Sequence, residues 1–169
     1  MHRNFVRAAM LLALMIALQS LRLFVPVPPF ISLFIIGSAI NACLLIALET
    51  TGIKAALLLA VLAPVIAFLQ QALPLPVFMV PVAVTNICYV LVYQVIATYN
   101  RWLSIGIASL TRMAVLYCSS TWAFAIVDLP DRQASILKTA MSWPQLITGI
   151  AGGLLCVSII KRIPLNSKR

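Results

Sequence analysis

The apolar run RAAMLLALMIALQSL (Arg7–Leu21) decides the fold, because it predicts a helix that crosses a membrane. Within it, Ala9, Ala13 and Ala17 recur at every fourth residue, which places all three on one face of that helix. A strip of small side chains lets another backbone approach closely inside a membrane. We therefore expect this face to be a surface on which a partner protein docks.

The composition of the whole chain is that of a membrane protein. Of its 169 residues, 63% are hydrophobic and 9% are charged, and the mean hydropathy is +1.11. Soluble domains have roughly 45–50% apolar and about 25% charged residues. The sequence predicts one integral membrane domain over residues 1–169. The basic start followed by an apolar run imitates a signal peptide, but further apolar segments follow, and we expect it to be retained as the first helix.

Proline-rich and polar breaks divide the chain into six apolar segments, which predict an all-α bundle of six transmembrane helices. The breaks include VPVPP at 25–29, ETTG at 49–52 and LPLP at 73–76. The longest polar connection, 128–142, contains a stretch that could form a short amphipathic helix, 133–140. The expected helices span residues 4–24, 30–48, 53–72, 77–98, 102–127 and 143–160.

The distribution of basic residues predicts the orientation, because Lys and Arg accumulate in cytoplasmic loops. Six crossings put both termini on one side, which holds eight of the basic residues, against three on the other side. Both termini are therefore expected in the cytoplasm. The net charge of +9 has the same explanation, and no basic patch interleaved with aromatic residues indicates nucleic-acid binding.

Arg112 is the polar residue that most needs an explanation, because it lies well inside the fifth segment. A charge at that depth rarely faces lipid. Two interpretations stay open: it holds an anionic group of a small-molecule cargo, or its side chain snorkels to the cytoplasmic surface. Arg22 has a similar ambiguity at the outer end of the first segment, where it either neutralises charge on the cargo or is an interfacial cation.

Other polar and aromatic residues are candidates for the same cargo site. Asn41 and Asn86 lie near the middle of their segments, where an amide contacts cargo or joins two helices by a hydrogen bond. Tyr117 and Trp122 are either interfacial anchors or stack on a flat ring. The candidate substrate-binding residues are Asn41, Asn86, Arg112, Tyr117, Trp122 and Gln145.

The residue types that catalysis or energy conversion needs are missing from the apolar segments. The three acids, Glu49, Asp128 and Asp131, lie in or beside the expected loops, and the one histidine is His2. The sequence offers no catalytic pair, no metal cluster, no cofactor motif and no phosphate-binding glycine loop. The four cysteines have no paired spacing. We expect neither an enzyme nor a self-powered transporter.

These features together resemble the substrate-binding S components of energy-coupling factor (ECF) transporters, which import vitamins and related micronutrients into bacteria. The resemblance rests on size, on the six-helix topology, on the alanine strip of the first helix and on the missing energy source. The stretch GSAINACLLIALETTGIKAALLLAVLAPVIAFLQQALPLPVFMVPVAVTN (37–86) is similar in layout to segments two to four of that family.

The resemblance implies a membrane scaffold (T) subunit and two cytoplasmic ATPase subunits as partners, with Ala9, Ala13 and Ala17 as the docking residues. It also implies that the cargo is a vitamin or similar micronutrient. The basic residues favour an anionic or carboxylated compound. The alternative is a structural membrane subunit of a cell-shape or cell-wall complex, which needs no pocket.

Overall fold

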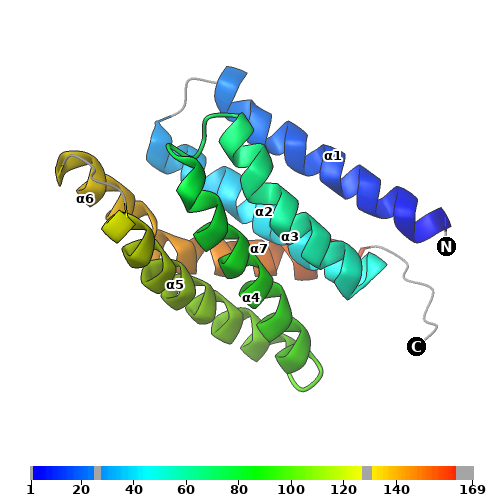
Figure 1. Ribbon diagram of the computed structural model, residues 1–169. Helices are drawn as coiled ribbons and strands as arrows, with labels where there is room; N and C mark the ends of the chain where they lie inside the picture. Colours follow the sequence, from blue (N-terminus) through cyan, green and yellow to red (C-terminus); the bar gives the residue numbers. More distant parts are fainter. Residues whose placement is uncertain (1, 25–27, 127–130, 163–169) are drawn as a thin grey trace.

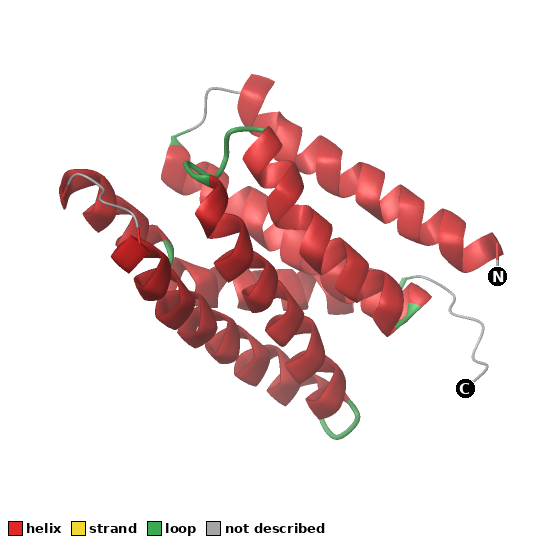
Figure 2. Cartoon of the chain, in the orientation of Figure 1, coloured by secondary structure: helices red, strands yellow, loops and turns green. Residues whose placement is uncertain are grey.

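The protein is built from helices joined by short loops. The structure, a computed structural model, describes residues 2–24, 28–126 and 131–162, and within these ranges it contains no strand (Figure 2). This confirms the all-α class. The elements are α1 (His2–Phe24), α2 (Pro29–Thr51), α3 (Ile53–Leu69), the 3₁₀ turn η1 (Pro76–Phe78), α4 (Met79–Ala97), α5 (Arg101–Ile126), α6 (Asp131–Ala140) and α7 (Trp143–Ile160).

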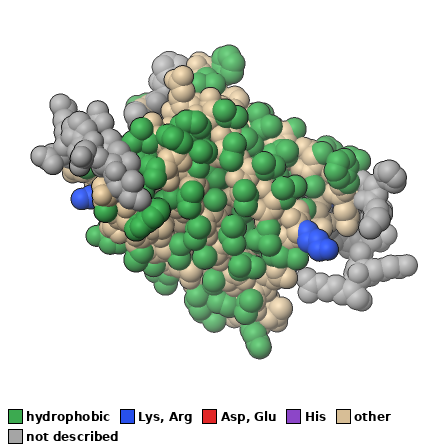
Figure 3. Space-filling model, in the orientation of Figure 1, with side chains coloured by type: hydrophobic (Ala, Val, Ile, Leu, Met, Phe, Trp, Pro, Cys, Tyr) green, Lys and Arg blue, Asp and Glu red, His purple; other side chains and the backbone are tan. Residues whose placement is uncertain are grey.

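The outer surface of the bundle is apolar, as a multi-pass membrane protein requires. Leu58 and Val80 are each 59% exposed, and hydrophobic side chains cover most of the face in Figure 3. In water such a surface would cause aggregation. Five stretches are long and apolar enough to cross a membrane: Asn4–Phe24, Phe30–Thr51, Pro76–Ala97, Arg101–Ala125 and Ala134–Ile160. The remaining apolar helix, α3, has 17 residues.

The boundary between α2 and α3 differs from the prediction. The residues expected as a polar turn, Glu49 to Thr51, form the last turn of α2. Thr50 and Thr51 donate their hydroxyls to the carbonyls of Ile46 and Ala47, at 2.7 and 2.6 Å, so their polar groups are satisfied within the helix. Gly52, at φ +95°, makes the turn.

The helix α3 ends at Leu69, three residues earlier than the predicted end at residue 72. Gln71 has a φ of +57°, the left-handed conformation that usually belongs to glycine after a helix. The amides of Gln71 and Ala72 donate to the carbonyls of Phe68 and Ala67, at 2.9 and 2.8 Å. This hydrogen-bond pattern closes a helix C-terminus, and no glycine marked it in the sequence.

The helices pack in a definite order around α2. The helix α7 packs against α2 and α5, and α4 packs against α3 and α5. The helix α1 lies at the edge of the bundle against α2 and α3 (Figure 1). Only 11% of its apolar stretch is buried, against 56% for α2. The N-terminal end of α1 and the C-terminal end of α7 lie at the same end of the bundle (Figure 1).

Glycines in α7 allow its close approach to α2 and α5. A methyl group added at Gly152 would lie 2.5 Å from the Cβ of Asn41 and 2.8 Å from the carbonyl oxygen of Ser38, both in α2. One at Gly149 would lie 2.7 Å from the Ser109 hydroxyl of α5. Such distances are below van der Waals contact, so the helices could not pack this closely with larger side chains.

We expect Gly152→Ala to destabilise the protein by about 1–3 kcal/mol, because backbone atoms of α2 would have to move away from the new methyl group. Thermal unfolding in detergent measures this change. Gly106→Ala in α5 is the matched control, since nothing lies within 4 Å of its added methyl group. The control is expected to leave the melting temperature unchanged or to raise it, because alanine favours a helix. Equal melting temperatures for both variants would contradict the packing argument.

The half of the bundle near the chain termini is densely packed apart from a polar hollow beside Arg101, whereas the other half encloses a cavity. Small and aliphatic residues fill the packed half, and Leu44, Leu45 and Val90 are completely buried there. Tyr89 joins α4 to α7 by donating its hydroxyl to the Gly149 carbonyl at 2.7 Å. The ring of Tyr89 also lies next to Arg112, a residue that lines the cavity.

Candidate binding site

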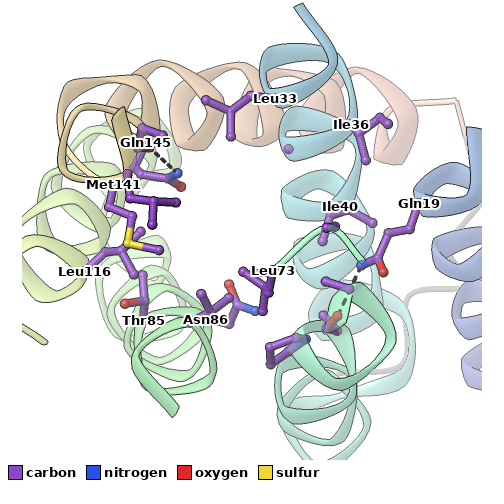
Figure 4. A pocket seen from close by; sticks show the side chains of 18 of the residues that line it. Gln19, Leu33, Ile36, Ile40, Leu73, Thr85, Asn86, Leu116, Met141 and Gln145 are labelled. Atoms are coloured by element: carbon purple, nitrogen blue, oxygen red, sulfur yellow. Dashed lines mark hydrogen bonds between the residues drawn. The ribbon is translucent and has the colours of Figure 1, made fainter. Parts of the chain in front are cut away.

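A cavity of about 190 Å³ lies between the helices, in the half of the bundle away from the termini. Helices α1 to α5 and α7 contribute to its wall, for example Gln19 of α1, Ile36 of α2 and Gln145 of α7 (Figure 4). The short helix α6 contributes Leu137 and Ala140. The lining is mainly apolar with a few polar groups, as is usual for a small-molecule site. Its polar side chains are those of Gln19, Arg22, Thr85, Asn86, Arg112 and Gln145.

Arg112 is the charged centre of this cavity. Its side chain is 7% exposed, and its two terminal nitrogens donate to Asn86 Oδ1 at 2.7 Å and to Gln145 Oε1 at 3.3 Å. The guanidinium also lies over the ring of Tyr89, 5.5 Å from the ring centroid. Because the side chain is held inside the bundle, the snorkelling interpretation of Arg112 does not hold.

The two amides beside Arg112 are fixed with their oxygens toward the guanidinium. The NH₂ group of Asn86 donates to the Ala60 carbonyl at 3.2 Å, and that of Gln145 donates to the Ala140 carbonyl at 3.0 Å. A rotated amide would lose its backbone bond and turn its donors toward the cation. The backbone of α3 and the end of α6 therefore hold the cationic group in place.

No carboxylate in the described part of the chain neutralises Arg112. Both of its hydrogen-bond partners are uncharged. The one acid whose side chain the structure describes, Glu49, lies at the opposite end of the bundle and pairs with Arg101 at 3.1 Å. A buried cation is costly unless it is paired, so this site is electrostatically suited to an anionic ligand.

Four buried polar atoms of cavity-lining residues have no hydrogen-bond partner among the described residues: Arg112 Nε, Arg22 Nε, Thr85 Oγ1 and Gln19 Oε1. Buried polar atoms without partners are rare in native proteins, and they point to a bound ligand or water. Together they offer donors from Arg112 and Arg22, an acceptor from Gln19, and a hydroxyl from Thr85 that can serve as either.

A second, wider hollow of about 480 Å³ adjoins the cavity toward the end of the bundle. The two share lining residues: Arg22, Leu33, Ala72, Leu137 and Ala140. Phe30, Gln70 and Gln71 extend the wall outward. Because they share these residues, we interpret the hollow as the entrance to the cavity, where half-buried Arg22 adds a second positive charge to that of Arg112.

Of the candidate residues from the sequence, the structure brings Asn86, Arg112 and Gln145 together in one hydrogen-bonded group. Asn41 lies elsewhere: it is fully buried, and its Cβ faces Gly152 of α7. Tyr117 and Trp122 are 52% and 60% exposed, and neither contributes to the described lining of the cavity. Their exposure agrees with the interpretation as interfacial anchors.

Gln19 and Thr85 are cavity residues that were not among the predicted binding residues. The signal for Gln19 is its spacing, because Met15, Gln19 and Arg22 share one face of α1. Met15 is fully buried and Gln19 is 4% exposed, so this face points into the bundle. Thr85 directly precedes Asn86 and is fully buried. The sequence alone does not indicate whether a threonine in an apolar helix faces a cavity.

The three alanines of α1 lie on the opposite side of that helix from Met15 and Gln19. Ala9, Ala13 and Ala17 are all exposed, so no other part of the described chain covers them. One helix therefore carries cavity residues on one face and a strip of small residues on the other. The strip is accessible to lipid or to another membrane helix.

Within the described residues, no three His, Cys, Asp or Glu side chains lie together as a metal site.

Comparisons with protein-family models, with curated proteins and with solved structures find no match to this chain. Cavity geometry and charge are therefore the grounds for assigning a function.

Proposed function

We propose that this protein is the substrate-binding S component of an ECF-type ABC importer that captures a small anionic vitamin or related micronutrient. The observation that supports it is the cavity around Arg112, where a buried cation has uncharged partners and lies beside unpartnered polar atoms. A carboxylate on the ligand would balance the charge of Arg112 and accept hydrogen bonds from it.

In this proposal the chain crosses a bacterial cell membrane six times: the five long apolar stretches each cross once, and α3 is the additional crossing. Its 17 residues give a helix of about 26 Å, close to the thickness of the hydrocarbon core of about 30 Å. The side that holds Lys54, Arg101, Lys161 and Arg162 is then cytoplasmic. The cavity entrance faces the outside, where a scavenged nutrient arrives.

The energy for import comes from partners, namely a membrane scaffold subunit and two cytoplasmic ATPase subunits. The exposed strip of Ala9, Ala13 and Ala17 is the proposed contact with the scaffold subunit. Since α1 is the least buried of the long apolar helices, a partner could reach most of its outward surface.

Mass spectrometry of small molecules released from the purified protein tests the proposal. We expect one small organic acid at close to equimolar amounts, and its absence from a membrane protein prepared in the same way without such a cavity. Recovery of lipid alone in repeated preparations would contradict the proposal and favour the alternative, a structural subunit of a cell-shape or cell-wall complex, which binds no small molecule.

A further inference from the structure

Gln19 gives the cavity a second recognition point, on the wall formed by α1. Its side chain is 4% exposed, and its Nε2 donates to the Ala63 carbonyl of α3 at 3.3 Å (Figure 4). Its Oε1 is buried and has no partner in the described chain. This oxygen is an unused acceptor at the edge of the cavity.

The hydrogen bond to Ala63 fixes the chemical character of this point. If the amide rotated by half a turn, Oε1 would face the carbonyl oxygen of Ala63, and two acceptors would repel each other. The cavity side of Gln19 is therefore an acceptor that a donor on a bound molecule can satisfy. Arg112, in contrast, has donors only.

The two recognition points belong to different parts of the bundle. Gln19 is on α1, which packs on α2 and α3, whereas Arg112 is on α5, which packs on α4 and α7. The rest of the lining is mainly aliphatic and includes Ile36, Ile40 and Leu116. A molecule that contacts both points must carry an anionic group at one end and a hydrogen-bond donor away from it.

We propose that the cavity selects small anions that also carry a hydroxyl or N–H group, and that Gln19 is the residue that reads this group while Arg112 binds the anion. This inference rests on the proposed function only in requiring that the cavity binds a small anion. A plain carboxylate leaves Gln19 Oε1 unpaired, which is the reason that the site discriminates against it.

Matched pairs of acids that differ by one hydroxyl test the inference: hexanoate with 6-hydroxyhexanoate, and benzoate with 4-hydroxybenzoate. Dissociation constants are measured by calorimetry on the full-length protein in detergent. We expect the hydroxylated acid of at least one pair to bind about three- to tenfold more tightly, the range of one hydrogen bond. Gln19→Met, which keeps the side-chain length and removes the acceptor, is expected to abolish that difference and leave the binding of the plain acid.

The matched control is Gln94→Met, at an exposed position of α4 beside the polar hollow near Arg101, at the other end of the bundle. It is expected to keep the preference for the hydroxylated acid. Two outcomes would overturn the inference and leave the proposed function standing. In the first, the acids bind in an Arg112-dependent way but neither pair shows a preference for the hydroxylated acid. In the second, Gln19→Met retains that preference. If Gln19→Met does not fold, the wild-type comparison of the pairs still decides. Failure of all four acids to bind in an Arg112-dependent way would overturn the proposed function, and this inference with it.

Discussion

Replacing Arg112 by glutamine is expected to weaken the binding of small carboxylates by at least about thirtyfold. Removing one partner of a buried, hydrogen-bonded charge pair costs about 2–5 kcal/mol, and each 1.4 kcal/mol is a factor of ten in affinity. Glutamine keeps hydrogen-bonding capacity beside Asn86 and Gln145 but removes the positive charge. Calorimetry with the acid recovered from the purified protein, or with benzoate, measures the effect.

The stability of the ligand-free protein should respond differently from its affinity. A buried cation without a counter-charge is costly, so Arg112→Gln is expected to leave the melting temperature of the empty protein unchanged or to raise it. Arg101→Gln is the matched control, since Arg101 binds the carboxylate of Glu49 at the other end of the bundle. It should leave the affinity unchanged. Equal losses of affinity in both variants would contradict the role of Arg112.

Replacing Ala13 by tryptophan is expected to reduce uptake below detection while ligand binding stays within about twofold of wild type, as for a surface change away from the site. Ala13 is the middle residue of the exposed alanine strip, and an indole there would keep a second helix from approaching. Uptake of the labelled ligand is measured in cells that contain the energising subunits, and binding is measured on the purified protein.

Leu14→Trp provides the control for this variant. Leu14 is the next residue of α1 and is 47% exposed, but it points about 100° away from Ala13 around the helix axis. We expect it to retain uptake. If Ala13→Trp cells import the ligand normally, the docking surface lies elsewhere. If the variant also loses binding, its defect is in folding rather than in docking.

The all-helical architecture could be predicted from the sequence, because prolines and polar breaks separate the apolar runs clearly. The helix ends were harder to predict. Thr50 and Thr51 look like turn residues, yet their hydroxyls bond to carbonyls one turn earlier and α2 continues through them. The end of α3 depends on a glutamine in a left-handed conformation, which carries no signal in the sequence. The short α6 was predicted as 133–140 and begins two residues earlier.

Part of the candidate site could also be predicted, because a charge and two amides inside apolar helices demand partners. Asn86, Arg112 and Gln145 satisfy one another, whereas Asn41, at a similar depth, faces Gly152. Helix spacing alone does not give the rotation of α2 relative to α4, and that rotation decides which asparagine faces the cavity. Gln19 was expected only at the outer end of the first segment and was not assigned to the site, because a polar residue near a helix end normally faces water or lipid headgroups.

The packed half of the bundle has a consequence for ions. Below Arg112, the described chain is filled by Tyr89, Val90, Leu44 and Leu45, all fully buried, so the basic cavity opens toward one end only. If the bundle crosses a membrane as proposed, we expect no continuous aqueous path through these fully buried residues. A protein with a cation buried inside it can therefore stay in a charged membrane without leaking protons or salts, and vesicles that contain it alone should hold a potential.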